Sequence, residues 1–126
     1  MEDHATVIDR VTRVVYAEAR LEPYEGKKAV AWVIKNRYNH PRKMYGKTIT
    51  EITQKKHQFA YWTRDVGDLE NWNESISAAE DVFYGGAPDP TKGSKHFLSG
   101  DCYPSWVRGK NPAVVIQGHR FYNNID

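Results

Sequence analysis

One acidic residue lies on a helix face that is otherwise apolar. At 100° per residue, Val11, Val14 and Val15 share one stripe of an N-terminal helix, and Glu18 follows them at helical spacing. A carboxyl in such surroundings loses hydration, which disfavours its ionised form and raises its pKa toward the range of a general acid. Two other interpretations stay open: a helix that ends before Glu18 and leaves it in water, or a structural pair with a buried arginine.

Large aromatic side chains also occur in segments that are polar or loop-like. They are Tyr61, Trp62, Tyr103 and Trp106. Large aromatic rings that stay exposed to water do not stabilise a small domain, so their exposure suggests a binding role. Sugar rings stack on aromatic faces through their axial C–H groups. Together with the acid on an apolar stripe, these rings predict a glycan-binding cleft. Rings that fill a core built of loops are the alternative.

The other chemistry-bearing residues form no recognised pattern. His57, His96 and His119 are scattered, without the close spacing of zinc ligands, and Cys102 is a lone cysteine in a loop. The sequence contains no Gly-x-Ser-x-Gly elbow and no glycine-rich phosphate loop. We therefore expect no metal and no cofactor, although three distant histidines that converge on zinc are kept as an alternative.

Composition limits the class of protein. The 126 residues are enough for one domain, residues 1–126, and the hydrophobic share of 40% is that of a globular chain. The net charge is +2 with dispersed basic residues, so we expect no nucleic-acid partner. We also expect no membrane span, no signal peptide in this chain and a monomer. The single cysteine excludes an internal disulfide.

Periodicity predicts helices first and a small β region last, which is an α+β, mainly helical fold. The expected helices cover Ala5–Ala19, a segment from about Tyr24 to Tyr38, a short helix opened by Thr48 and Glu51 at capping-box spacing, and Trp72–Tyr84. The expected β segments are Lys95–Leu98 and Val114–Gln117, with His119–Tyr122 as a continuation of the second.

Several motifs occur in one order along nearly the whole chain, from about Val14 to Tyr122. They are Tyr16-Ala-Glu-Ala-Arg20 with its continuation to Gly26, Ala29–Arg37, Gln58-Phe59, Lys95-His-Phe97 with Tyr103-Pro-Ser-Trp106, and His119-Arg-Phe-Tyr122. In this order and spacing the chain resembles the cell-wall hydrolases of the spore-cortex-lytic type (SleB/CwlJ-like).

The resemblance implies a lysozyme-like domain, similar to goose-type lysozymes and lytic transglycosylases. It implies cleavage of peptidoglycan glycan strands between N-acetylmuramic acid (MurNAc) and N-acetylglucosamine (GlcNAc). Some members of the family resemble lytic transglycosylases, which leave a 1,6-anhydro end instead of adding water. The family's catalytic glutamate corresponds to Glu18. Action at the cell wall follows, in the spore cortex or coat during germination, outside the cytoplasm, or as a phage endolysin.

With the resemblance in hand, the other motif residues take expected roles. We expect the sugar to be bound by Gln58, Phe59, Trp62, His96, Trp106, His119 and Tyr122. Arg37 and Asn36 are expected to support the helix that carries Glu18. Hydrolysis would normally use a second carboxylate. Its candidates are Glu22, Glu25 and Asp65, none of which stands out, as expected for a transglycosylase that uses one carboxyl.

The chain departs from the family pattern at two positions. Leu21 stands where glycine is usual and could narrow the cleft, and Lys27 stands where glutamine is common. Two other functions are kept as alternatives: a zinc-dependent peptidoglycan amidase that uses His57, His96 and His119, and a non-catalytic glycan-binding module.

Overall fold

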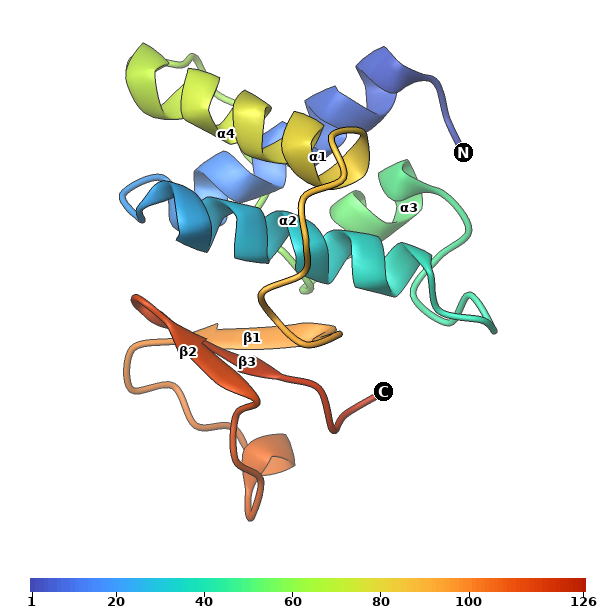
Figure 1. Ribbon diagram of the computed structural model, residues 1–126, viewed down its shortest axis with the longest axis vertical. Helices are drawn as coiled ribbons and strands as arrows, with labels where there is room; N and C mark the ends of the chain where they lie inside the picture. The colour runs from blue at the N-terminus through green and yellow to red at the C-terminus, as the bar shows by residue number, and fades with distance from the viewer.

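The computed structural model describes residues 1–126 and consists of four helices followed by a small sheet (Figure 1). The helices are α1 (His4–Ala19), α2 (Tyr24–Tyr38), α3 (Ile49–Gln54) and α4 (Leu69–Phe83). They are followed by β1 (His96–Ser99), the 3₁₀ helix η1 (Ser105–Val107), β2 (Val114–Ile116) and β3 (His119–Tyr122). The α+β, mainly helical prediction is confirmed. None of the helices has both the length and the apolar character needed to span a membrane.

Side-chain caps set where three of the helices begin. Asp3 and Thr48 each accept a hydrogen bond from the backbone N–H three residues later. For Thr48 this is the cap that its spacing to Glu51 predicts. Helix α4 begins at Leu69 rather than at Trp72, because Asp68 caps it in the same way. Residues 69–71, which precede the predicted start of this helix, therefore belong to the first turn of α4.

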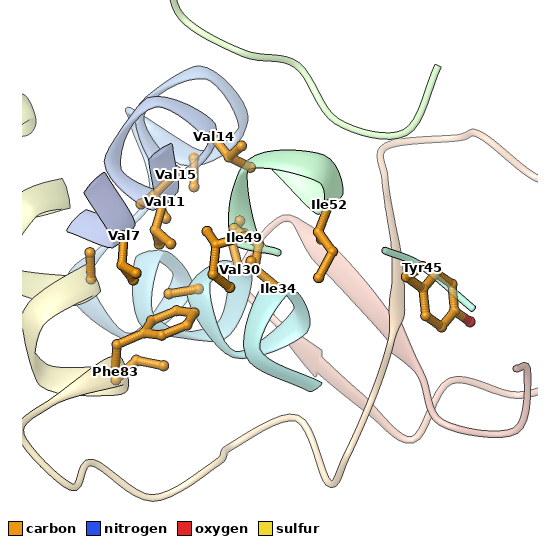
Figure 2. Packing of buried hydrophobic residues seen from close by; sticks show 14 residues of the cluster. Val7, Val11, Val14, Val15, Val30, Ile34, Tyr45, Ile49, Ile52 and Phe83 are labelled. Atoms are coloured by element: carbon orange, nitrogen blue, oxygen red, sulfur yellow. The ribbon is translucent and has the colours of Figure 1, made fainter. Parts of the chain in front are cut away.

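The hydrophobic core lies between the four helices, and α2 stands at its centre (Figure 2). The labelled side chains in this core are Val7, Val11, Val14 and Val15 of α1, Val30 and Ile34 of α2, Ile49 and Ile52 of α3, Phe83 of α4, and Tyr45. The opposite face of α2 packs against the sheet through Ala29, Val33 and Phe121. Because α2 is covered on both sides, it joins the helical layer to the sheet seen below it in Figure 1.

The sheet has the order β1-β3-β2, and both pairs are antiparallel. The prediction that His119–Tyr122 continues the preceding strand is wrong, because the chain reverses at Gln117-Gly118 and pairs Ile116 with His119. The same register places Ser99 of β1 opposite His119. Paired residues lie on one face of a sheet, so the pairing of β1 with β3 brings the side chains of Ser99 and His119 to the same side.

A buried lysine holds the connection between α1 and α2. Lys27 is 0% exposed, and its Nζ donates to the backbone oxygens of Arg20 at 2.9 Å and Glu22 at 2.6 Å. It also donates to Asn71 Oδ1 at 3.2 Å and pairs with Glu74 at 3.0 Å. One ammonium group thus satisfies two carbonyls of the turn and ties that turn to α4.

Lys27→Gln is therefore expected to lower the free energy of unfolding by about 1–2 kcal/mol, because the neutral amide leaves some of these acceptors unpaired. Urea denaturation followed by circular dichroism measures the loss. Lys110→Gln is the matched control, since Lys110 is exposed and its side chain has no hydrogen bond in the structure. Equal stability of the two variants would contradict this role of Lys27.

Candidate active site

Two hollows meet at Glu18. One has a volume of about 470 Å³ and the other about 390 Å³. Only Glu18 and Ser99 line both of them. The two hollows therefore form one cleft with the carboxyl at its midpoint, and a chain of sugars that fills both would pass directly over Glu18.

The Glu18 carboxyl is held in the last turn of α1, where the apolar stripe leaves the core. Its Oε2 accepts a hydrogen bond from the backbone N–H of Ala60 at 3.1 Å. Burial raises the pKa of Glu18 above its ordinary value of 4.5, and the hydrogen bond from Ala60, together with the nearby His119 and Arg37 side chains, opposes this rise. Since burial is the largest of these causes, the group is suited to hold a proton and to deliver it.

Arg37 organises the wall of the first hollow. It is 5% exposed, and its Nε donates to the backbone oxygen of Lys95 at 2.7 Å while Nη1 donates to Gln58 Oε1 at 3.0 Å. Burial lowers the pKa of Arg37 to about 10, so the guanidinium stays charged at neutral pH. No ion pair joins it to Glu18, so Arg37 acts on the carboxyl through its charge and not by direct contact.

His96 lies in the same hollow as a neutral ring. Its Nδ1 is 3.4 Å from Nη2 of Arg37, which can only donate, and its Nε2 is 3.1 Å from the hydroxyl of Tyr45. The Nε2–H tautomer satisfies both contacts. Burial, together with the charge of Arg37, lowers the pKa of His96 to about 4. The Trp106 ring is tilted over His96 at a centroid distance of 5.4 Å and is 40% exposed.

This histidine gives the fold a pH dependence with a defined sign. The pKa of His96 is about 4 in the folded chain and 6.5, the ordinary value for histidine, in the unfolded chain. Between these two pH values His96 binds a proton in the unfolded chain but not in the folded chain. We therefore expect the free energy of unfolding to fall as the pH is lowered through this window, and His96→Gln to flatten the fall. Urea denaturation at a series of pH values measures it. His57→Gln, at an exposed position, should leave the slope unchanged; an unchanged slope in His96→Gln would contradict the assignment.

The second hollow lies on the other side of Glu18. Trp62 and His119 line it, together with Leu21 and Glu22. Trp62 packs edge-on against Tyr16 at a centroid distance of 4.9 Å, which fixes its ring in the wall. Leu21 is 80% exposed at this hollow.

Most of the predicted site residues converge on this cleft. Glu18 shares the first hollow with Arg37, Gln58, Phe59, His96 and Trp106, and the second with Trp62 and His119. Asn36 lies outside it and donates to Asp89 Oδ2 and to the backbone oxygen of Ser94, each at 3.0 Å, so it holds the loop before β1 onto α2.

Tyr122 differs from its expected role. It is predicted among the sugar-binding residues, but its ring is 1% exposed and lines neither hollow. It packs edge-on against Trp106 at a centroid distance of 6.2 Å. Tyr122 therefore supports Trp106 from behind, on the face of β3 opposite to Phe121.

Several residues that line the cleft were not singled out by sequence reasoning, among them Ser99 and Glu22. Ser99 follows the aromatic run of β1 and carries no motif of its own. Glu22 is one of the three candidates for a second carboxylate, and nothing in the sequence distinguishes it from the other two. Only the fold brings it to His119, which is 97 positions away. The glycine before His119 is the one local signal, because it marks a place where another group approaches the backbone closely.

The three histidines of the zinc alternative do not come together. Nowhere does the chain gather three or more His, Cys, Asp or Glu side chains that could hold a metal ion. His57 is exposed, His96 contacts Arg37 and Tyr45, and His119 contacts Glu22.

Comparisons with known proteins agree with this geometry. No curated protein matches the sequence. Among solved structures, the catalytic domain of the SleB protein of Bacillus cereus matches with a TM-score of 0.77 at 24% identity, covering 96% of this chain and 92% of that one. The catalytic domain of the germination-specific lytic transglycosylase SleB of Bacillus anthracis matches with a TM-score of 0.76 at 24% identity, covering 96% of both chains. These two likenesses confirm the predicted lysozyme-like fold.

The sequence was also compared with models of protein families. The model of the family described as Cell Wall Hydrolase matches residues 21–122, a range that begins three residues after Glu18 and includes every other predicted site residue. Because the match covers most of the chain, this protein belongs to the cell wall hydrolase family.

Proposed function

We propose that the protein cleaves the glycan backbone of peptidoglycan between MurNAc and GlcNAc, as a lytic transglycosylase with Glu18 as its one catalytic carboxyl. The observation that carries the proposal is the place of Glu18: a desolvated acid at the meeting point of two hollows, each lined by aromatic rings. A glycan strand in this cleft would present one glycosidic bond to one proton donor.

The reaction needs only this carboxyl. Protonated Glu18 donates to the glycosidic oxygen while the bond to C1 of the muramic acid breaks through an oxocarbenium-like state. The carboxylate that results then takes the proton of the C6 hydroxyl, and O6 attacks C1 to close the 1,6-anhydro ring. The proton on Glu18 is thereby restored, and no water is consumed.

The environment of Glu22 supports transglycosylation over hydrolysis. Glu22 is the one other carboxylate that lines the cleft, and its Oε1 already accepts hydrogen bonds from the backbone N–H of Gly118 and from His119. A carboxylate engaged in this way is poorly placed to activate a water molecule. The description of the Bacillus anthracis relative as a lytic transglycosylase supports the same choice by analogy.

Family membership also supports a place of action. We infer that the protein works at the cell wall, in the spore cortex or elsewhere outside the cytoplasm, with peptidoglycan glycan strands as its partner. Germination is the setting named for the Bacillus anthracis relative. We propose that the protein acts as a monomer, because the whole cleft is built from one chain.

Digestion of purified sacculi, followed by mass spectrometry of the released fragments, tests the proposal. We expect muramic acid ends that are lighter by one water than ordinary reducing ends. Ordinary reducing ends would mean hydrolysis of the same bond, and freed peptides would mean an amidase. Sacculi that bind the protein but release nothing soluble would mean a glycan-binding module. Each of the last three results overturns the proposal as stated.

A further inference from the structure

Glu22 occupies a place that two glycines keep open. A Cβ at Gly26 would lie 3.0 Å from Glu22 Cβ, and a Cβ at Gly118 would lie 3.2 Å from Glu22 Oε1. Neither glycine has a positive φ, so backbone conformation does not account for them. The close approach of Glu22 does, and the side chain is fitted to its site from both sides.

The carboxylate is bonded to the hairpin between β2 and β3. Its Oε1 accepts from the backbone N–H of Gly118 at 2.8 Å and lies 3.2 Å from His119 Nδ1. The neighbouring Gln117 has a φ of 52°, in the left-handed region that side chains other than glycine rarely adopt. Lys27 holds the backbone oxygen of Glu22 from the other side. The end of α1 and the turn of the hairpin are thus fastened to each other through Glu22.

This contact decides which nitrogen of His119 carries the proton. An ionised carboxylate can only accept, so Nδ1 must donate to it, and Nε2 of the neutral ring is then left with a lone pair. Nε2 has no partner in the protein and is not among its fully buried, unpartnered polar atoms. Although the His119 ring is 4% exposed, this nitrogen therefore reaches the second hollow, beside Glu18.

We propose that Glu22 is a positioning residue that holds His119 in the Nδ1–H tautomer, so that Nε2 presents a hydrogen-bond acceptor to an N–H or O–H group of the sugar in the second hollow. The identity of that ligand as an N-acetylated sugar rests on the proposed function; the tautomer does not. Glu22 itself need not touch the sugar, because it acts through the imidazole.

Long-range ¹H–¹⁵N NMR of protein labelled with ¹⁵N-histidine tests the tautomer without any substrate. We expect the resonances of His119 to report Nδ1–H in the wild type and to shift toward Nε2–H, the form favoured by free histidine, in Glu22→Ala. Glu22→Gln keeps an oxygen acceptor of the same shape and should retain Nδ1–H, which provides a test if Glu22→Ala does not fold. Glu70→Gln, exposed on α4, is the matched control.

Kinetics on sacculi provide the second measurement. Losing one correctly oriented hydrogen bond to substrate corresponds to about tenfold in affinity, so we expect Glu22→Ala to raise KM about tenfold and to change kcat less. An Nε2–H tautomer in the wild type, or a wild-type KM in a folded Glu22→Ala, would overturn the proposal. If instead the wild type fails to cleave sacculi while His119 shows the Nδ1–H form, the proposed function fails and the tautomer assignment stands.

Discussion

Glu18→Gln is expected to reduce the release of glycan fragments from sacculi by roughly 10³-fold or more, within the range that general acid–base catalysis contributes. The loss should fall in the upper part of that range, because the same carboxyl serves as acid in the first step and as base in the second. The decrease in turbidity of a sacculus suspension measures the rate, and mass spectrometry shows whether any residual product has the same ends.

The fold should survive this substitution. Glutamine has the shape of a protonated glutamate, and its amide oxygen can still accept the hydrogen bond that Ala60 donates to Glu18. We therefore expect Glu18→Gln to bind sacculi as the wild type does and to unfold at the same temperature. Asp65→Asn, which removes an exposed carboxylate, should leave the rate unchanged. Full activity of Glu18→Gln, or loss of activity in Asp65→Asn, would remove Glu18 from its central role.

Arg37→Ala is expected to lower the free energy of unfolding by about 3–5 kcal/mol, because two hydrogen bonds from a charged donor are lost and a cavity is left behind. Its guanidinium joins α2 to the Gln58 loop and to the chain just before β1, and it lies over the Phe59 ring at 4.5 Å. These segments form the wall of the first hollow. Thermal and urea denaturation measure the loss of stability, and the sacculus assay measures the accompanying loss of cleavage.

Arg37→Lys separates charge from geometry. Lysine keeps the positive charge, but its single ammonium cannot reproduce the planar fork that reaches Lys95 and Gln58 together. We expect this variant to recover only part of the lost stability. Arg108→Ala, at an exposed position, controls for removal of an arginine. If Arg37→Ala were as stable as Arg108→Ala, Arg37 would not organise the wall.

Local signals in the sequence account for most of the fold. Helical periodicity and the caps at Asp3 and Thr48 define α1 and α3 closely, because both signals depend on residues within one or two turns of each other. The start of α4 was predicted three residues late, since Asp68 lies in a polar stretch with no capping glutamate after it. Nothing in the sequence marks such a cap once the apolar periodicity is absent.

The sheet was the least predictable part. Strands β2 and β3 are short, and their turn contains Gln117 where a hairpin of this length normally shows asparagine, aspartate or glycine. A continuous strand was therefore the natural prediction. The reversal depends on pairing with β1, which lies about twenty residues earlier in the chain. Such pairing is decided by tertiary structure.

The site residues that could be predicted are those whose type is unusual for their local sequence. Glu18 stands out as an acid on an apolar stripe, and Trp62 and Trp106 stand out as rings in loops. The contact of Glu22 with His119 spans 97 positions, and the burial of Tyr122 depends on how the segment that carries Trp106 folds over β3. Neither follows from spacing along the chain.

The titration of Glu18 is the most direct test of the account. With ¹³C-labelled glutamate, NMR follows the side-chain carboxyl of Glu18 as the pH is varied, and the pH dependence of kcat/KM is measured on the same preparation. We expect the carboxyl to titrate above 4.5, and cleavage to decline as the pH rises through that same midpoint, because only the protonated form can donate. A midpoint at or below 4.5, with cleavage that continues unchanged well above it, would contradict the claim that Glu18 is the acid.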